Sequence, residues 1–333
     1  MSRPPGHPVS LTEFEADVRA GLSKADQKEL YSKYLYDALG TALFEAITLL
    51  PEYGLTRADL RLLDGHAREL SNWCVNLSTV VELGSGSGEK ARRILSHLVK
   101  TGPLTYCPVD LSGAALNRCV RDVDDITGLK IIPIEDSYIS GLASASKLRK
   151  AETSVLVLFL GSSIGNFDPP VAEQFLIAVR EKLKSGDVLL LGTDLVKDLD
   201  QILAAYNDPL GLTAAFNLNL LLRINRALGA NFDVRQFEHE ARYNLADQRI
   251  EMHLRSKSDQ VISISPGFTV TLKKDETIWT ESSYKFRPEQ IRSMSERSGF
   301  SCEAQWIDEE WPFAQSLLRI TSLHGDRRAG LIE

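Results

Sequence analysis

The sequence predicts an α/β fold in which a Rossmann-like core is joined to a second, α+β lobe. Between residues 73 and 198, short apolar runs alternate with stretches of helical spacing, which is typical of a parallel sheet buried on both faces. A glycine-rich turn follows the first of these runs, as it does in nucleotide-binding sheets. After residue 236, apolar and polar residues alternate, which indicates antiparallel strands with one solvated face.

The N-terminal part of the chain predicts helices. Residues 1–10 are rich in proline and glycine and are expected to be loose. Residues 11–72 are interpreted as helical, because YLYDALGTALFEAITLL carries apolar residues at helical spacing. The Leu-Pro-Glu-Tyr-Gly segment at 50–54 breaks this pattern and predicts a turn.

The core is predicted from alternating strands and helices. Its expected strands are Ser78–Leu83, Leu104–Val109, Lys130–Ile134, Val155–Leu160 and Val188–Leu191. The expected helices are Glu89–Val99, Ala114–Asp122 and Val171–Leu183. Ligands of such sheets bind beyond the carboxyl ends of the strands, and glycines and acidic residues cluster there in this sequence.

The second half of the chain follows a different pattern. Residues 198–228 are interpreted as one helical segment, and residues 236–286 as antiparallel strands, followed by a helix over 288–298. These patterns predict four parts, which are a helical segment that joins the second lobe, the core, the lobe itself and a return to the core. Their predicted bounds are 1–72, 73–198, 199–286 and 287–333.

Composition excludes several classes of function. The net charge is −7 and basic residues are not clustered, which argues against a nucleic-acid partner. No apolar run is long enough to span a membrane, and no secretory signal is evident. The four cysteines are scattered, which favours free thiols in the cytoplasm, and the six histidines show no metal-ligand spacing. We expect a metal-free, cytoplasmic monomer that acts on a small molecule.

The stretch VVELGSGSGEKAR indicates an adenosine-containing ligand. Gly84, Gly86 and Gly88 do not complete the dinucleotide fingerprint, which would need glycine or alanine where Glu89 stands. The stretch also lacks the Gly-Lys-Ser/Thr of a phosphate loop, and a carboxylate at the helix start would repel a pyrophosphate. A ligand without phosphate, S-adenosylmethionine, is therefore favoured.

Charged side chains near the next strand ends support this donor. Asp110, at the end of the second strand, is expected to bind the ribose hydroxyls, and Asp136 with the adjacent Ser137 to bind the adenine. Lys90 is expected to meet the methionine carboxylate. The alternative is that the glycines form only a tight turn and that each acid caps a helix.

Several longer motifs resemble one enzyme family. The segments VVELGSGSGEKAR, FLGSSIGNF, LLLGTDLVKD, GLTAAFNLNLLLRINRALGANFD, RIEMHL and TESSYKF together resemble the histidine-specific Nα-methyltransferases of ergothioneine biosynthesis. The resemblance extends from about Leu30 to the C-terminus. It implies a class I S-adenosylmethionine-dependent methyltransferase core and trimethylation of the histidine α-amine to hercynine.

The resemblance also implies the acceptor site. It assigns the amino-acid carboxylate to Tyr53, Asn166 and Tyr206, and the imidazole ring to Glu281 and Ser283. It assigns the surroundings of the amine and the pocket wall to Tyr36, Phe44, Gly161, Ser163 and Met252. Tyr36 and Asn166 are taken as the catalytic residues among these. On the residues alone, each would more often be a core, turn or solvated residue.

The sequence departs from the family pattern at two places. Ser163 stands where threonine is usual, which keeps the hydroxyl. Gly54 follows Tyr53 where an aromatic residue is common, which predicts a looser pocket wall. His253 follows Met252 in a predicted strand, and is therefore expected to point away from the pocket.

Two alternatives remain open beside histidine methylation. The acceptor could be tryptophan or a prenylated tryptophan, although Glu281 and Met252 argue against an indole. The chain could also bind S-adenosylmethionine without catalysis, which the presence of Asn166, Tyr206 and Glu281 argues against. A protein or nucleic-acid methyltransferase would need an open groove, and nothing basic in the sequence supports one.

Overall fold

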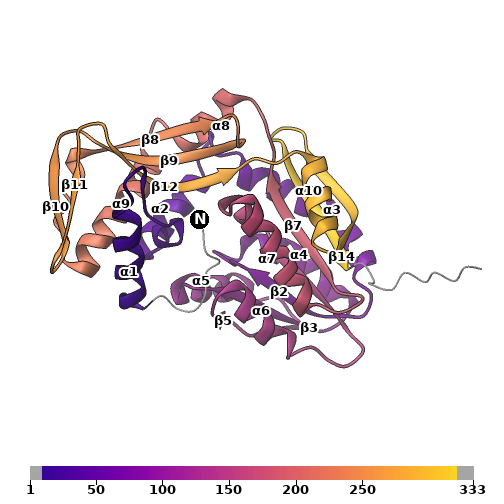
Figure 1. Cartoon of the computed structure of the whole chain (residues 1–333). Coiled ribbons are helices and arrows are strands. Elements are labelled where there is room, and N and C mark those ends of the chain that lie inside the picture. The colour runs from indigo at the N-terminus through magenta and orange to yellow at the C-terminus, as the bar shows by residue number, and fades with distance from the viewer. Residues whose placement is uncertain (1–9, 321–333) are drawn as a thin grey trace, which may run out of the picture.

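The main sheet has eight strands, and the computed structural model describes residues 10–320 of the chain (Figure 1). The parallel strands are β2 (Leu77–Leu83), β3 (Leu104–Asp110), β4 (Leu129–Ile131), β5 (Ile134–Glu135), β6 (Ser154–Phe159) and β7 (Val188–Asp194). The antiparallel pair β13 (Phe300–Asp308) and β14 (Phe313–Ile320) adds to the edge at β7. The order is β13-β14-β7-β6-β2-β3-β4, and β5 also pairs with β3.

The strand order reverses between β2 and β6, and at such a switch point open α/β sheets form a crevice in which ligands bind. The chain winds outward from β2 to β4 in one direction and from β6 to β7 in the other, so the loops after β2 and β6 diverge at the carboxyl edge. The glycine turn at residues 84–88 follows β2, and the Gly161 loop follows β6. The predicted Rossmann-like core is therefore confirmed, with its glycine turn beside the crevice.

One strand of the main sheet is interrupted relative to the prediction, and two others were not predicted. The strand expected over 130–134 is interrupted, because Pro133 has no N–H for the ladder, so β4 ends at Ile131 and β5 begins at Ile134. The strands β13 and β14 were not predicted, although β14 lies beside β7 and is buried from Phe313 to Leu318.

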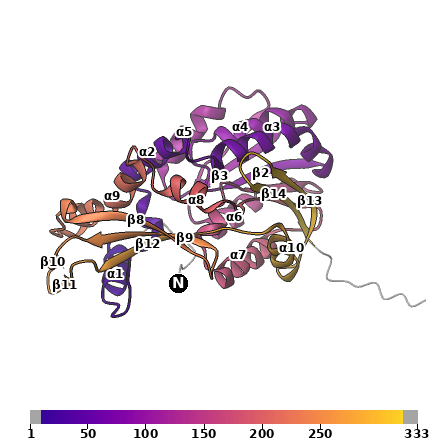
Figure 2. The ribbon, with the colours of Figure 1, turned by 90° about the horizontal axis from the view of Figure 1, so that it is seen from above.

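Helices cover both faces of the main sheet (Figures 1 and 2). One face is covered by α3 (Leu55–Trp73), α4 (Glu89–Leu98) and α5 (Gly113–Val123), whose apolar side chains share a cluster with the sheet. The other is covered by α6 (Tyr138–Ser146), α7 (Pro169–Lys182) and α10 (Pro288–Arg297). Helix α6 was not predicted, since YISGLASAS is built mostly from small and polar residues and lacks a clear apolar face.

The second lobe contains a four-stranded sheet in the order β1-β12-β9-β8. Its strands are β1 (Lys28–Glu29), β8 (Phe237–Asn244), β9 (Arg249–Ser256) and β12 (Thr277–Tyr284), and a hairpin is formed by β10 (Gln260–Ser265) and β11 (Phe268–Leu272). The helices around it are α1 (Leu11–Leu22), α2 (Ala38–Thr48), α8 (Leu199–Tyr206) and α9 (Leu212–Leu228). Four short 3₁₀ turns are Ser32–Leu35, Val99–Thr101, Ser163–Asn166 and Val234–Gln236.

The helical segment predicted over 198–228 is two helices. The first helix, α8, ends at Tyr206. Asp208, in the connection, accepts hydrogen bonds from the backbone N–H groups of Leu212 and Thr213, at 2.9 and 2.7 Å, and so caps the start of the second helix, α9. Gly211 has a φ of 74° and precedes α9. The break places Tyr206 at the end of α8, where it faces the lobe sheet.

A β-bulge in β12 changes which of its residues face the lobe core. Before the bulge, Ile278 lies opposite the buried Leu254 of β9; after it, Glu281 lies opposite Met252. The core-facing residues of β12 thus change from even to odd numbers at Thr280, because a bulge opposes two residues to one on the partner strand. Glu281 is turned inward by this extra residue.

Helix α3 contacts both parts of the molecule. Leu55 and Leu62 in its first half pack into the apolar cluster of the second lobe, whereas Leu63 and Leu70 pack against the main sheet. The predicted boundaries after residues 72, 198 and 286 stay predictions. The expected looseness of residues 1–10 falls, apart from Ser10, outside the described residues.

Candidate functional site

The glycine turn after β2 has the backbone of a close-approach loop. Gly84, Gly86 and Gly88 have φ values of 79°, 52° and 90°, in the left-handed region that favours glycine. A Cβ on Gly88 would lie 3.0 Å from Cys119 Cα, so this position also lacks room for a side chain. The N–H groups of the three glycines are bonded within the protein, to Val109 O, Asp110 Oδ2 and Ser85 O, so these bonds hold the turn in its conformation.

Two acids at neighbouring strand ends flank this turn. Asp110 Oδ2 accepts from Gly86 N at 3.4 Å, and its Oδ1 accepts from Ser112 N at 2.9 Å. Burial raises the pKa of Asp110, and the N–H groups of Ser112 and Gly86 lower it in part. The N-cap of α5 is Ser112, so the alternative that Asp110 serves only as a helix cap is not supported. Asp136 accepts from Ser137 N at 2.7 Å, next to the buried Ser137 side chain.

Lys90 has a resident partner that was not predicted. Its Nζ lies 2.9 Å from Asp59 Oδ2, and the Asp59 side chain is fully buried. Asp59 also accepts from Gly161 N at 2.9 Å and from Gln315 Nε2 at 2.6 Å. One carboxylate thus joins α3, α4, the loop after β6 and β14. The contact of Lys90 with the methionine carboxylate stays a prediction.

Gly161 has a left-handed backbone conformation, which favours glycine. Its φ is 69°, and a Cβ at this position would lie 2.8 Å from Lys90 Nζ. The next residue, Ser162, is also left-handed, with a φ of 60°, and its Oγ accepts from Asp194 N at 2.8 Å. A non-glycine residue held in this region is strained, and such strain is concentrated at functional sites. Ser163 donates its hydroxyl to Leu160 O at 3.2 Å.

Glu82 lies beneath the glycine turn. Its side chain is buried and accepts a hydrogen bond from the Tyr106 hydroxyl. Burial raises the pKa of Glu82 to about 8, although Tyr106 and Lys90 lower it in part. This carboxyl supports the turn from within the sheet.

The predicted acceptor aromatics form a continuous wall. Ring centroids are 5.5 Å apart for Tyr36 and Phe44, 6.2 Å for Phe44 and Tyr53, and 6.4 Å for Tyr53 and Tyr206. Phe216 of α9 extends the wall, 5.4 Å from Tyr36, and was not predicted because it reads as an ordinary core residue of an amphipathic helix. The structure thus brings the three aromatic residues of segment 36–53 together with Tyr206 and Phe216 from a distant part of the chain.

Burial keeps the phenols of this wall neutral. It raises the pKa of Tyr36 and of Tyr53 well above the ordinary value, and the Glu281 charge adds to the shift at Tyr36. A neutral phenol can orient an amine by hydrogen bonding. It already carries its own proton, however, and does not take up a second one at neutral pH. A tyrosine as the final proton acceptor is therefore disfavoured, which leaves water for that role.

Glu281 and Asn166 face each other across the junction of core and lobe. Asn166 Nδ2 donates to Glu281 Oε1 at 3.1 Å, and Met252 is the cross-strand neighbour of Glu281. Glu281 is only 8% exposed, so it is not the solvated strand residue that its surroundings in the sequence would favour. Burial raises the pKa of Glu281 to about 7, although Lys285 and Asn166 lower it in part.

Tyr206 and Ser283 share a hydrogen-bonded group with Lys285. The Tyr206 hydroxyl donates to Ser283 Oγ at 2.9 Å, and Lys285 Nζ donates to both oxygens. Lys285 is paired with Asp194, which also binds Lys197. Burial opposes ionisation of Asp194, but the two ammonium groups lower its pKa below the ordinary value.

The loop that carries Tyr53 is held on both sides. Arg57 donates to the carbonyl oxygens of Leu50 and Pro51, at 2.7 and 2.6 Å. The predicted loosening at Gly54 is wrong, because the Trp311 indole occupies the space where its side chain would be: a Cβ there would lie 2.2 Å from the ring. Glycine is required for this packing.

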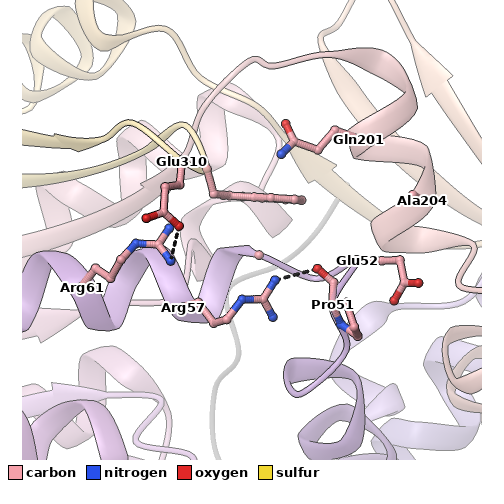
Figure 3. Close-up of a pocket in the computed structure, with 9 residues that line it drawn as sticks. Pro51, Glu52, Arg57, Arg61, Gln201, Ala204 and Glu310 are labelled. Carbon is pink, nitrogen blue, oxygen red and sulfur yellow. Dashed lines mark hydrogen bonds and ion pairs between the residues drawn. The ribbon is translucent and has the colours of Figure 1, made fainter.

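A pocket of about 250 Å³ opens on the outer side of this loop (Figure 3). It is lined by Pro51, Glu52, Gly54, Arg57, Arg61, Gln201, Ala204, Glu310 and Trp311. Arg61 is paired there with Glu310 at 3.1 Å, and with Asp308. Arg61 is thus paired with acids, and Arg57 is hydrogen-bonded to the loop that carries Tyr53. None of the predicted site residues lines this pocket.

His253 points away from the acceptor site, as predicted. It stacks on Trp279, with ring centroids 6.0 Å apart, and its Nε2 lies 3.1 Å from Glu251 Oε2, whereas Met252 packs into the lobe core. Within residues 10–320, no three His, Cys, Asp or Glu side chains are grouped as metal ligands, and no helix is long and apolar enough to cross a membrane.

Known proteins resemble the chain over nearly its whole length. A family profile described as histidine-specific methyltransferase, SAM-dependent, matches residues 14–320. A histidine N-alpha-methyltransferase of Mycobacterium tuberculosis (strain CDC 1551 / Oshkosh) is 39% identical, over 94% of this chain and 96% of that protein.

Two fungal proteins are more distant. Ergothioneine biosynthesis protein 1 of Neurospora crassa is 29% identical, over 77% of this chain and 31% of that protein. The L-tryptophan methyltransferase trpM of Psilocybe serbica is 27% identical, over 93% of this chain and 94% of that protein.

Proposed function

Because the chain belongs to the histidine-specific, SAM-dependent methyltransferase family, we propose that it trimethylates the α-amine of L-histidine. The product is hercynine, a step of ergothioneine biosynthesis. The observation that carries this substrate is the buried Glu281, which is held by Asn166 opposite Met252, inside an aromatic wall. A carboxylate in this position accepts the N–H of an imidazole ring.

In this proposal the donor lies at the crevice between β2 and β6. Gly84 and Gly86 admit the methionine part, Asp110 accepts from the ribose hydroxyls, and Asp136 with Ser137 binds the adenine. S-adenosylmethionine supplies an activated methyl group on a sulfonium. The residues of the chain therefore need to position the two partners rather than to activate either of them.

The acceptor is held by the aromatic wall and the polar groups beside it. Tyr53 and Asn166 bind the carboxylate, and Tyr36 orients the neutral amine for in-line attack. The predicted contact of Tyr206 with the carboxylate is replaced by packing of its ring in the wall, because its only hydroxyl hydrogen is donated to Ser283 Oγ. As the N–C bond forms, the C–S bond breaks, S-adenosylhomocysteine leaves and the amine proton passes to water. Three transfers end in a quaternary ammonium, which each aromatic face stabilises by about 0.5–2 kcal/mol.

The remaining predicted residues complete this pocket. Phe44 lies between Tyr36 and Tyr53 in the wall, and Gly161 and Ser163 shape the loop above it. All of these residues lie in one chain, so the proposal needs only a monomer. The four free cysteines agree with a cytoplasmic enzyme.

Tryptophan is the second candidate acceptor, because a relative named for it aligns with 93% of this chain. An indole has an N–H but no second ring nitrogen, and it is larger than imidazole. A buried polar group left without its partner costs about 1–3 kcal/mol, and Ser283 would lose its ring contact. We therefore favour histidine.

The assay that tests the proposal offers the enzyme S-adenosylmethionine with each amino acid in turn, followed by mass spectrometry. We expect a gain of three methyl groups on histidine alone. Turnover of tryptophan with none of histidine would instead support the second candidate. Donor binding without turnover of any amino acid would indicate a non-catalytic protein.

Replacing Asp110 with asparagine is expected to weaken S-adenosylmethionine binding by about 10- to 100-fold, because hydrogen bonds to a charged acceptor contribute about 1.5–3 kcal/mol. Isothermal titration with the donor measures this. Asp122→Asn, at a partly buried acid in α5 away from the crevice, is the control. An unchanged dissociation constant for Asp110→Asn would remove this residue from the donor site.

A further inference from the structure

A fully buried lysine adjoins the proposed acceptor site. Lys285 Nζ lies 2.9 Å from Asp194 Oδ2, 3.0 Å from the Tyr206 hydroxyl oxygen and 2.9 Å from Ser283 Oγ, and its side chain is 0% exposed. An ammonium has three hydrogens and no lone pair, so these three contacts use all of its donors. Lys285 therefore acts on its neighbours, and has no donor left for a substrate.

These contacts fix the direction of the hydrogen bonds around it. The Tyr206 hydroxyl oxygen accepts a hydrogen bond from Lys285, and the same hydroxyl donates a hydrogen bond to Ser283 Oγ. Ser283 Oγ accepts a second hydrogen from Lys285, so both of its lone pairs are occupied. Among residues 10–320, the hydroxyl proton of Ser283 has no acceptor. Ser283 is thus left as a donor only.

Ser283 and Glu281 then offer opposite hydrogen-bonding groups on one face of the strand. They are two residues apart after the bulge, and their cross-strand partners Ile250 and Met252 both face the lobe core. Glu281 accepts as a carboxylate, and Ser283 donates. A neutral imidazole matches this pair, since it has one N–H and one bare nitrogen.

We propose that Lys285 is a positioning residue that holds Ser283 as a hydrogen-bond donor and so commits the site to a neutral imidazole ring in one tautomer. This rests on the proposed function, because the ring is that of the histidine substrate. Imidazolium has two N–H groups and no bare nitrogen, so it cannot accept from Ser283 and is disfavoured by hydrogen bonding.

Lys197 offers a matched control. It binds the same carboxylate of Asp194, and its side chain is 1% exposed, but its other acceptor is the carbonyl of Leu195. No described contact joins Lys197 to Tyr206 or Ser283. In Lys285→Met, Asp194 keeps Lys197 and the Trp311 indole N–H at 3.0 Å as partners, so its charge is not left unpaired.

The kinetic test compares L-histidine with β-(2-thienyl)-L-alanine, a ring of similar size that lacks nitrogen. We expect Lys285→Met to raise the KM for histidine by about 10- to 100-fold relative to the inhibition constant of the thienyl compound. Lys197→Met should leave this ratio within about threefold. In a Ser283→Ala background, Lys285→Met should change it little further. Donor affinity and the thermal midpoint report on folding.

Two results would overturn the inference while the wild type still methylates histidine: an equal loss for both compounds, or an unchanged ratio. If the wild type does not methylate histidine, the proposed function fails first. A measurement without variants covers the case in which Lys285→Met does not fold. Ring-¹⁵N-labelled histidine, bound to the wild type with S-adenosylhomocysteine, should show one protonated and one bare nitrogen between about pH 6 and 8. Averaged tautomers or a doubly protonated ring would contradict it.

Discussion

Replacing Glu281 with alanine is expected to raise the KM for L-histidine by about 10- to 100-fold and to improve the binding of tryptophan relative to histidine. The substitution removes the acceptor of the ring N–H, and an unpaired buried polar group costs about 1–3 kcal/mol. It also frees space opposite Met252, where an indole would lie. Initial rates with both amino acids at saturating donor measure the effect.

The controls for this experiment separate charge from shape. Glu281→Gln keeps the size and one acceptor, so its loss should be smaller, whereas Glu238→Ala removes a half-exposed carboxylate from the same lobe and should change nothing. Unchanged histidine kinetics in Glu281→Ala would exclude Glu281 from the acceptor site.

The pH dependence of Glu281 gives a further readout. Burial raises its pKa to about 7, so it ionises, and becomes a full acceptor, as the pH rises through neutrality. The corresponding rise in histidine affinity near pH 7 should vanish in Glu281→Gln. For stability the sign is opposite, because the folded pKa lies above the unfolded value of about 4.3. The stabilising contribution of Glu281 is complete below pH ~4.3 and is lost as the pH rises to about 7.

Replacing Asp59 with alanine is expected to lower the free energy of unfolding by about 3–5 kcal/mol, because it removes one partner of a buried ion pair. Lys90, Gly161 N and the Gln315 amide would all lose the acceptor that joins them. Urea denaturation followed by tryptophan fluorescence measures the change.

Asp64→Ala is the matched control for this prediction, since it lies on the same helix and pairs with Arg93 at 3.2 Å, but is half exposed. Exposed ion pairs contribute about 0–1 kcal/mol, so this variant should remain near the wild type. Equal effects of the two substitutions would show that the Asp59 network is not what joins α3 to the core.

Much of the core could be predicted because its strands are nearly continuous apolar runs, such as Val155 to Phe159. Proline has no N–H, so Pro133 also indicates a break in the strand. The apolar residues around it nevertheless favoured a single continuous strand. Helix α6 and the strands β13 and β14 were missed because their local patterns are weak. Pairing with β7 fixes β14, and such long-range contacts are not visible in a local window.

The site was predictable where a motif carried it, and not where three-dimensional contacts did. Glu281, Ser283, Asn166 and Tyr206 were named from the family resemblance, and the structure brings them together in bonded pairs. Lysines and aspartates are usually solvated, so Asp59, Asp194 and Lys285 gave no local sign of burial. Apart from Lys197 and Ser283, which are near in the sequence, the partners named above lie more than thirty residues away.

The extra residue in β12 has a consequence for how acceptor preference can change in descent. Glu281, Ser283 and Lys285 are alternate residues after Thr280. They face inward because the bulge changes which alternate residues of the strand point to the core. Deleting Thr280 would remove the bulge and keep Glu281 opposite Met252, whereas deleting one residue after Glu281 would turn Ser283 and Lys285 to the other face of the strand. A relative could thus exchange one set of ring-binding groups for another through one insertion or deletion, without passing through a series of single substitutions.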